Sequence, residues 1–281
     1  MTHPPDLTDR RALLFRRARA LRRGAELFLH EEVAVEIEER LSEVNKRFTA
    51  PAVVTGFPQV WQARFADARI VADDPVLALA PEAHDLVIHA LALHWADDPV
   101  GQLVQCRRAL RPDGLMVAAL FGGQTLHELR TVLAEAESRL TGGLSPRVLP
   151  MAEIRDLGAL LQRVGFALPV ADCITRTITY RSAFHLFDDL RAMAETNAMA
   201  GRSRKPAPRA LFTEAARLYA EHFPAPDDRI AATFEIVFLT GWAPHESQQK
   251  PLRPGSAAAR LADALGVPER SADQARDDLA D

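Results

Sequence analysis

Residues 85–98 have the sequence DLVIHALALHWADD, and residues 115–120 have the sequence LMVAAL. Both contain short apolar runs, which are typical of strands buried on both faces of a parallel sheet. The stretch 99–110 between them predicts a helix, and Arg111-Pro112-Asp113-Gly114 predicts the turn that ends it. A strand, a helix and a second strand in this order imply a right-handed crossover, so the stretch predicts a doubly wound α/β fold with a mostly parallel sheet.

The same alternation extends in both directions from this stretch. Residues 8–47 predict helix with a break at Gly24. We expect further strands at residues 52–56, 69–73, 174–180 and 230–241, and further helices at 58–66, 125–140, 151–164, 184–199 and 212–222. The domain prediction is an N-terminal helical segment over 1–47, an α/β domain over 48–250 with a helical insertion around 125–222, and a loop with a disordered tail over 251–281.

The composition excludes several classes of protein. The chain has 281 residues, of which 48% are hydrophobic, and this is enough for a sizeable core. Its two cysteines, Cys106 and Cys173, match no disulfide framework or zinc pattern, and we expect no metal. The net charge of −4 predicts no nucleic-acid partner. The sequence motifs of zinc hydrolases, nucleotide hydrolases and serine hydrolases do not occur.

Two features of the sequence concern location. No apolar run approaches the roughly 18 residues needed to cross a bilayer, and residues 1–9 lack the basic start of a signal peptide, so we expect a cytoplasmic protein. Seven arginines between Arg10 and Arg23 precede a stretch rich in glutamate, 26–39. This pattern has two open interpretations, which are two solvated helix faces or an arginine face for peripheral contact with an anionic partner or a membrane.

The order of the central elements resembles the class I S-adenosylmethionine-dependent methyltransferases, whose fold is Rossmann-like. Residues 85–98 look like the fourth strand and following loop of that superfamily, and 108–114 look like its proline-aspartate-glycine turn. Four downstream stretches narrow the resemblance: FGGQTLHELR at 121–130, GGLSPR at 142–147, DDLRAMAETN at 188–197 and GWAPHESQQKP at 241–251. Together they resemble the mitochondrial complex I assembly factors that hydroxylate an arginine, and their α-proteobacterial relatives, over most of residues 10–257.

This resemblance implies a fold, a cofactor and a role. The implied fold is the class I methyltransferase type, truncated in its first half, with N-terminal helices and a helical addition. The implied ligand is S-adenosylmethionine, and the implied partner is a protein substrate or a respiratory complex I subunit, modified on arginine. Two alternatives stay open: a non-catalytic assembly or chaperone-like protein that has lost S-adenosylmethionine binding, and a small-molecule or acyl-carrier methyltransferase.

The expected cofactor position departs from the family pattern. A nucleotide-type ligand binds at the carboxyl ends of the first strands, on a glycine-rich turn followed by an acid for the ribose. Here residues 53–58, VVTGFP, supply only Gly56, and Phe57 and Pro58 crowd the turn. The acids Asp73 and Asp74 match the third strand of the family best, with a ribose-binding role for Asp73 as the alternative. The predicted cofactor-binding residues are Gly56, Asp73, Asp74, Ala90 and Trp95.

Three residues are predicted to be catalytic. His94 follows a buried strand at the carboxyl edge of the sheet, where it can serve as a general base, while Trp95 can stack on a flat ring. The other two, Glu195 and Asn197, belong to a polar group that can bind a guanidinium or a carboxylate. The structural alternatives are a His–Trp pair that closes the core and an internal salt-bridge network.

The remaining candidates are predicted to bind substrate. Thr125, Glu128 and Arg130 follow Gly122-Gly123 at a helix start, where free amide groups can hold an anion; the alternative is a capping box of Thr125 and Glu128. Trp242, His245 and Gln248 follow the last predicted strand. They can form a lid over the site, or else a surface loop that seals the edge of the sheet. The full set is Thr125, Glu128, Arg130, Arg191, Trp242, His245 and Gln248.

Overall fold

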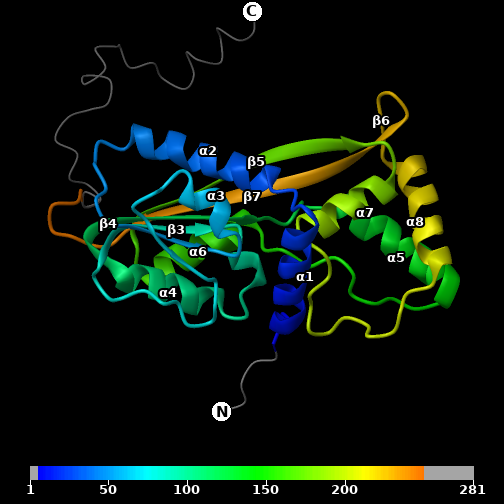
Figure 1. Ribbon diagram of the computed structural model, residues 1–281, viewed down its shortest axis with the longest axis horizontal. Coiled ribbons are helices and arrows are strands. Elements are labelled where there is room, and N and C mark those ends of the chain that lie inside the picture. Colours follow the sequence, from blue (N-terminus) through cyan, green and yellow to red (C-terminus); the bar gives the residue numbers. More distant parts are fainter. Residues whose placement is uncertain (1–5, 250–281) are drawn as a thin grey trace, which may run out of the picture. The chain divides into compact units, whose positions relative to one another are not determined.

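The computed structural model describes residues 6–249, and residues 6–245 belong to one compact unit (Figure 1). The predicted tail over 251–281 lies outside the described residues. In the described part of the chain, no helix is long and apolar enough to cross a membrane.

One mixed sheet forms the centre of this unit. Its order is β2-β1-β3-β4-β7-β5, with the short β6 paired to β7. The neighbours β2, β1, β3 and β4 are parallel, whereas β7 runs antiparallel to both β4 and β5. The strands are β1 Pro51–Thr55, β2 Arg69–Val71, β3 His84–Ala90, β4 Leu110–Phe121, β5 Ala167–Tyr180, β6 Pro224–Ala225 and β7 Arg229–Trp242. The predicted doubly wound, mostly parallel α/β sheet is therefore confirmed.

The burial of each strand follows from its place in the sheet. The central strand β3 is buried at every position except Asp85, as its apolar sequence predicts. The edge strand β5 alternates between exposed and partly buried residues, because one of its faces is turned to solvent. The prediction of a half-exposed strand from Ile174 to Tyr180 is confirmed, although the strand begins earlier, at Ala167.

Helices cover both faces of the sheet. The α-helices are α1 Arg10–Arg23, α2 Phe28–Glu43, α3 Pro58–Gln62, α4 Pro99–Ala109, α5 His127–Thr141, α6 Ile154–Val164, α7 Ala183–Ala192 and α8 Arg209–His222, and a short 3-10 helix, η1, spans Leu93–Trp95. One hydrophobic cluster contains residues of α2, α5, α7 and α8, and a second contains residues of α4 and α6. The predicted break after α1 is confirmed at Gly24, whose φ of 86° lies in the region that favours glycine.

The prediction of a helix over 184–199 is wrong in its length. α7 ends at Ala192, and Ala194 has a φ of 62°, a left-handed conformation that ends a helix. The amide of Glu195 then bonds to the carbonyl of Leu190. Residues 195–197 therefore lie outside the helix, and Glu195 accepts a hydrogen bond from Trp95, which follows β3.

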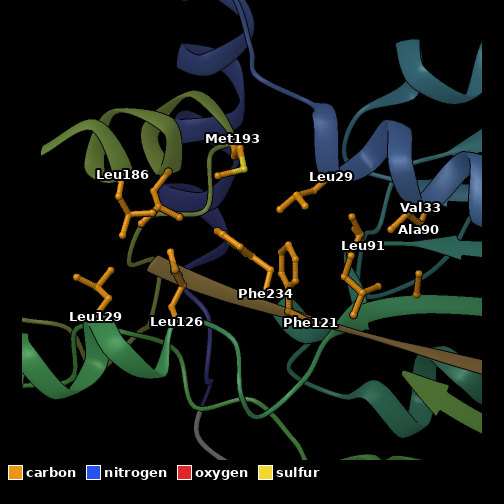
Figure 2. Packing of buried hydrophobic residues seen from close by; sticks show 14 of the residues in the cluster. Leu29, Val33, Ala90, Leu91, Phe121, Leu126, Leu129, Leu186, Met193 and Phe234 are labelled. Carbon is orange, nitrogen blue, oxygen red and sulfur yellow. The ribbon is translucent and has the colours of Figure 1, made fainter. Parts of the chain in front are cut away.

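The first hydrophobic cluster is continuous from the sheet into the added helices. The rings of Phe121 in β4 and Phe234 in β7 lie 6.1 Å apart between their centroids. Figure 2 shows these two rings between Leu29 of α2 on one side and Leu126 with Leu186 on the other. Helix α2, the sheet and the helical addition thus share one core, whereas the buried residues Leu13 and Ala20 of α1 belong to two smaller clusters.

Candidate functional site at the carboxyl edge of the sheet

Three parallel strands end side by side at one edge of the sheet. Thr55 of β1 pairs with Ala90 of β3, and Ala90 pairs with Ala119 of β4, two residues before that strand ends. Figure 1 shows α1 at this edge, between the α3 and α4 side of the unit and the group formed by α5, α7 and α8. The edge carries two pockets, one on each side of α1.

The first pocket, here called the Gly56 pocket, lies between α1 and the ends of β1 and β2. Its volume is about 290 Å³, and it is lined by Leu14, Arg17, Thr55, Gly56, Pro58, Gln62, Ile70, Val71, Ala72 and Asp73. Since β2 pairs directly with β1, Asp73 follows the strand beside β1. The match of Asp73 to a third strand is therefore wrong in position, and the alternative that places it where a ribose-binding acid stands is the one that agrees with the sheet.

Two arginines of α1 donate hydrogen bonds to the carboxylate of Asp73. Arg17 donates to Asp73 Oδ1 at 2.7 Å, and Arg10 donates to both oxygens at 3.0 Å. Burial alone raises the pKa of Asp73, but the charges and hydrogen bonds of the two guanidinium groups outweigh it and hold this pKa well below its ordinary value. Asp73 and Arg17 are 3% and 5% exposed, so the pair is a buried ion pair.

Arg17 also fills the space directly over Gly56. A Cβ atom added at Gly56 would overlap the Arg17 guanidinium, so this glycine permits the close approach of an internal arginine. The other predicted cofactor residues are dispersed. Asp74 is mostly exposed and bonds to Arg10, Ala90 is fully buried inside β3, and Trp95 lies on the wall of the other pocket.

The second pocket, here called the Glu195 pocket, lies between the sheet edge and the helical addition. Its volume is about 260 Å³. Its apolar wall consists of Trp95, Phe121, Leu126, Leu129, Leu133, Val148, Leu149, Met151, Phe187, Leu190, Phe212 and Phe234. Its polar residues are Arg16, Thr125, Arg147, Arg191, Glu195, Thr196 and Asn197. The structure thus brings together the predicted residues Trp95, Thr125, Arg191, Glu195 and Asn197.

Glu195 is the buried anion of this pocket, with its side chain 9% exposed. Trp95 Nε1 donates to Glu195 Oε2 at 3.0 Å, and His94 Nε2 lies 3.4 Å from the same oxygen. Burial raises the pKa of Glu195, but His94 and the charge of Arg17 outweigh burial and hold this pKa below its ordinary value. The carboxyl group is therefore ionised at neutral pH. Within residues 6–249, both side-chain contacts go to Oε2, which leaves Oε1 as an acceptor for a ligand.

The other two predicted catalytic residues have structural contacts. The His94 ring lies behind Glu195, only 2% exposed, and packs against Phe121 with 4.9 Å between ring centroids. This position suits it to orient the carboxylate. Asn197 donates from Nδ2 to the carbonyl of Pro146 at 2.8 Å, and its Oδ1 accepts from the amide of Met199 at 3.1 Å. Both ends of its amide are thus bonded to the backbone.

The capping-box interpretation of α5 is wrong. The helix begins at His127, its cap residue is Leu126 with a φ of 54°, and no side chain bonds to the cap. Instead, the Thr125 hydroxyl bonds to both backbone groups of Glu235 in β7. Glu128 is buried and accepts from the amide and hydroxyl of Thr233 in the same strand. Both side chains join α5 to the sheet, because their partners lie across the fold.

Two more predicted substrate-binding residues, Arg130 of α5 and Arg191 of α7, lie apart from the pocket or at its rim. Arg130 donates to the carbonyl groups of Thr125 and Leu149 and does not line the Glu195 pocket. Arg191 lines the pocket, but its side chain is 54% exposed and pairs with Asp188. The amides of Thr125, Leu126 and His127 donate to backbone carbonyl groups, so they are not free to hold the anion predicted at this helix start.

Trp242, the last residue of β7, lies at the opposite end of the sheet. Trp242 pairs with Leu115, whereas Phe121 at the pocket pairs with Ile236, and six strand residues span roughly 20 Å. The prediction that Trp242, His245 and Gln248 form a lid over the site is therefore wrong for Trp242. His245 follows two residues after an amide–carbonyl pair between Ala243 and Gly114 at that same end. Gln248 lies beyond the compact unit.

The sequence predicted the arginines of α1 only as one basic face, and it did not predict the separate positions of Arg16 and Arg17 at the two pockets. Arg17 is buried, whereas Arg11 is exposed. A signal was present: Arg17 shares a helix face with the buried residues Leu13 and Ala20, at spacings of four and three. An arginine inside an apolar stripe indicates a buried partner.

Comparisons with known proteins show which families and proteins the chain is similar to. A methyltransferase domain family matches residues 16–118. The mitochondrial arginine-hydroxylase NDUFAF5 of Dictyostelium discoideum is 40% identical over 196 residues, which are 69% of this chain and 45% of that protein. The protein of the same name from Homo sapiens is 35% identical over 214 residues, 76% of this chain and 62% of that protein. A malonyl-[acyl-carrier protein] O-methyltransferase of Laribacter hongkongensis is 33% identical over 190 residues, 68% and 61% of the two chains.

The sheet order and the domain match together define a class I methyltransferase-like protein. Within that class, the chain is a relative of the mitochondrial arginine-hydroxylase NDUFAF5. It spans less than two thirds of the length of each of these relatives.

Proposed function

We propose that this protein binds an arginine side chain of a protein substrate in the Glu195 pocket, as a step in respiratory complex I assembly. The observation that carries the proposal is the buried, ionised carboxylate of Glu195, whose Oε1 has no hydrogen bond within residues 6–249. The similarity to proteins named arginine-hydroxylases supports arginine as the target.

The chemistry of the pocket suits an arginine in two ways. A guanidinium group carries five N–H donors in a planar fork, which matches a carboxylate in a site of low dielectric constant. The methylene stem of arginine is apolar and can pack against the aromatic and aliphatic wall that Phe121, Phe187 and Phe234 help to form. Glu195 is the binding residue, and His94 and Trp95 are positioning residues that hold its carboxylate.

The test is a calorimetric titration of the full chain with two matched peptides. One peptide carries arginine, and the other carries citrulline, which has nearly the same shape and no charge. We expect the arginine peptide to bind at least about tenfold more tightly, because a charged hydrogen bond contributes roughly 1.5–3 kcal/mol. Equal binding of the two peptides would contradict the proposal.

A second candidate is an assembly protein that binds its partner without S-adenosylmethionine. The arrangement of the Gly56 pocket favours it, since Arg17 lies on Gly56 and the carboxylate of Asp73 is occupied by Arg10 and Arg17. An adenosyl group needs access to the backbone at Gly56 and a free acid for its ribose. Because Arg17 covers Gly56 and pairs with Asp73, the Gly56 pocket in this arrangement does not fit an adenosyl group. We therefore propose arginine recognition and assign no methyl-transfer step.

A thermal-shift measurement checks this second candidate. We expect millimolar S-adenosylmethionine to leave the Tm of the wild-type chain unchanged, because a ligand raises Tm only by binding the folded state. The arginine peptide in the same assay is the positive control. A rise in Tm of several degrees with S-adenosylmethionine, lost in Asp73→Asn, would show that the site admits the cofactor. Turnover that depends on an acyl-carrier protein would instead favour the acyl-carrier methyltransferase alternative.

We further propose a cytoplasmic protein that touches an anionic membrane surface through α1. Phe15 is 61% exposed, and Leu14 and Leu21 are also exposed on the outer part of this helix. They are accompanied by the exposed arginines Arg11, Arg19, Arg22 and Arg23. An apolar strip flanked by arginines is typical of helices that lie in a membrane interface.

Sedimentation with lipid vesicles measures this contact. We expect binding to vesicles that contain anionic lipid, and little binding to vesicles of neutral lipid. Phe15→Ala should reduce the bound fraction severalfold, because it removes the largest exposed apolar side chain of the helix. Binding that is the same for neutral vesicles, or for Phe15→Ala, would contradict the proposed contact.

A further inference from the structure

Arg16 is a half-buried cation in the wall of the Glu195 pocket. Its Nη1 donates to the carbonyl of Thr196 at 3.2 Å, and within residues 6–249 the Arg16 side chain forms no ion pair. The other two arginines of the pocket differ, since Arg147 pairs with Glu137 and Arg191 pairs with Asp188. Arg16 therefore faces the pocket with a positive charge that no carboxylate of the described residues pairs with directly.

Asp9 is a nearby anion, and its charge raises the pKa of Arg16. Within residues 6–249 it forms no ion pair with Arg16, and its carboxylate already accepts hydrogen bonds from Arg202 and Arg204. Burial and the charge of Arg202 lower the pKa of Arg16, yet an arginine remains charged at neutral pH. A partly desolvated cation of this kind gains from any carboxylate that a ligand brings.

The position of Arg16 relative to Glu195 defines a pair of charges. Arg16 bonds to the carbonyl of Thr196, the residue that follows Glu195, and both side chains line the same pocket. In the part of the chain that the structure describes, no ion pair joins Arg16 to Glu195, so the pocket presents an anion and a cation that are each open to a ligand. A ligand that complements both carries a cation and an anion close together.

We infer, resting on the proposed function, that the substrate carries an aspartate or glutamate within one or two residues of the arginine, and that Arg16 binds its carboxylate. Neighbouring Cα atoms are about 3.8 Å apart, so side chains at this separation can reach two groups in one pocket. Glu195 then recognises the arginine, and Arg16 is a specificity-determining residue that recognises the flanking acid.

A matched peptide series tests this inference. Three peptides of equal length carry the same arginine next to glutamate, alanine or lysine, and each is titrated calorimetrically into the full chain at low salt. We expect the wild-type chain to bind the glutamate peptide about 5- to 30-fold more tightly than the alanine peptide, and the lysine peptide most weakly. The preference should shrink as salt is raised, because one of its two charges is only half-buried.

Variants of Arg16 supply the decisive comparison. Arg16→Gln should bind the glutamate and alanine peptides equally, and Arg16→Glu should prefer the lysine peptide. Arg155→Gln is the control of equal net charge, since Arg155 is exposed on α6, outside the pocket, and it should keep the wild-type preference. If Arg16→Gln is poorly folded by circular dichroism, Arg16→Lys keeps the charge without the planar fork and should show a reduced preference of the same sign.

The outcomes separate this inference from the proposed function. If the wild-type chain binds all three arginine peptides equally, the inference is wrong and arginine recognition stands. If it binds none of them, the proposed function fails and the inference with it. A folded Arg16→Gln chain that keeps the preference for the glutamate peptide also overturns the role of Arg16.

Discussion

In the Glu195→Gln variant, binding of the arginine peptide should weaken by about one to two orders of magnitude. The substitution keeps the shape of the side chain and removes the charge that the guanidinium group needs. A hydrogen bond to a charged group contributes roughly 1.5–3 kcal/mol, which corresponds to about 10- to 100-fold in Kd. The amide group of glutamine also adds donors that face the donors of the guanidinium. Calorimetry on the wild-type and variant chains measures the difference.

Two controls keep this result tied to the pocket. The glutamine carbonyl oxygen can still accept from Trp95 Nε1, so the Tm of the variant should stay within a few degrees of the wild type. The pH dependence gives a second check: the pKa of Glu195 lies below its ordinary value of 4.5, so wild-type binding should persist down to about pH 5. Unchanged affinity in a folded Glu195→Gln chain would rule out this carboxylate as the arginine receptor.

Asp73→Asn should lower the free energy of unfolding by about 3–5 kcal/mol. The wild-type carboxylate is nearly fully buried between Arg10 and Arg17, and the variant leaves the buried guanidinium of Arg17 without an anion. Removing one partner of a buried ion pair costs more than the pair contributes, because the remaining charge is desolvated and unpaired. Unfolding in urea, followed by circular dichroism, measures the change.

Two control variants test whether the loss of stability in Asp73→Asn comes from the unpaired charge of Arg17. Asp74→Asn removes a mostly exposed carboxylate that also bonds Arg10, and should cost less than about 1 kcal/mol. Adding Arg17→Met to Asp73→Asn should restore part of the stability, because the unpaired buried charge is then removed. If Asp73→Asn is as stable as Asp74→Asn, the ion pair does not anchor α1.

The same ion pair predicts how stability depends on pH. The folded-state pKa of Asp73 is lowered from its ordinary value of 3.8, so its contribution is fully present above that pH. As the pH falls below 3.8, the unfolded chain takes up the proton first and the contribution is lost progressively. The stability difference between the wild type and Asp73→Asn should therefore shrink in acid.

The anchor at Asp73 also connects the two pockets. Arg16 and Arg17 are consecutive on α1, and consecutive helical residues point in different directions, so one lines the Glu195 pocket and the other lines the Gly56 pocket. The ion pair that holds Arg17 on Gly56 thereby sets the position of Arg16. A helix that shifts at Asp73 would alter arginine recognition at the other pocket.

The sequence alone predicted most elements of the fold. The apolar runs at 85–90 and 115–120 became the adjacent central strands β3 and β4, and Gly24 separated α1 from α2. These features are local, because hydrophobic period and backbone preference are properties of a few neighbouring residues. Of the site, the sequence placed His94, Trp95 and Glu195 among the candidates, since their strand end and polar composition are also local signals.

The tertiary structure decided which side chains meet. Thr125 and Glu128 have the spacing of a capping box, yet their partners are Glu235 and Thr233, more than 100 residues away. Trp242 ends the last strand, but the antiparallel direction of β7 takes it to the far end of the sheet from the pocket. From the sequence, Asp73 could bind a ribose. In the structure, α1 places Arg17 against its carboxylate instead. Such partners depend on the course of the whole chain, because a charge or hydrogen-bonding group pairs with whatever the fold brings within reach.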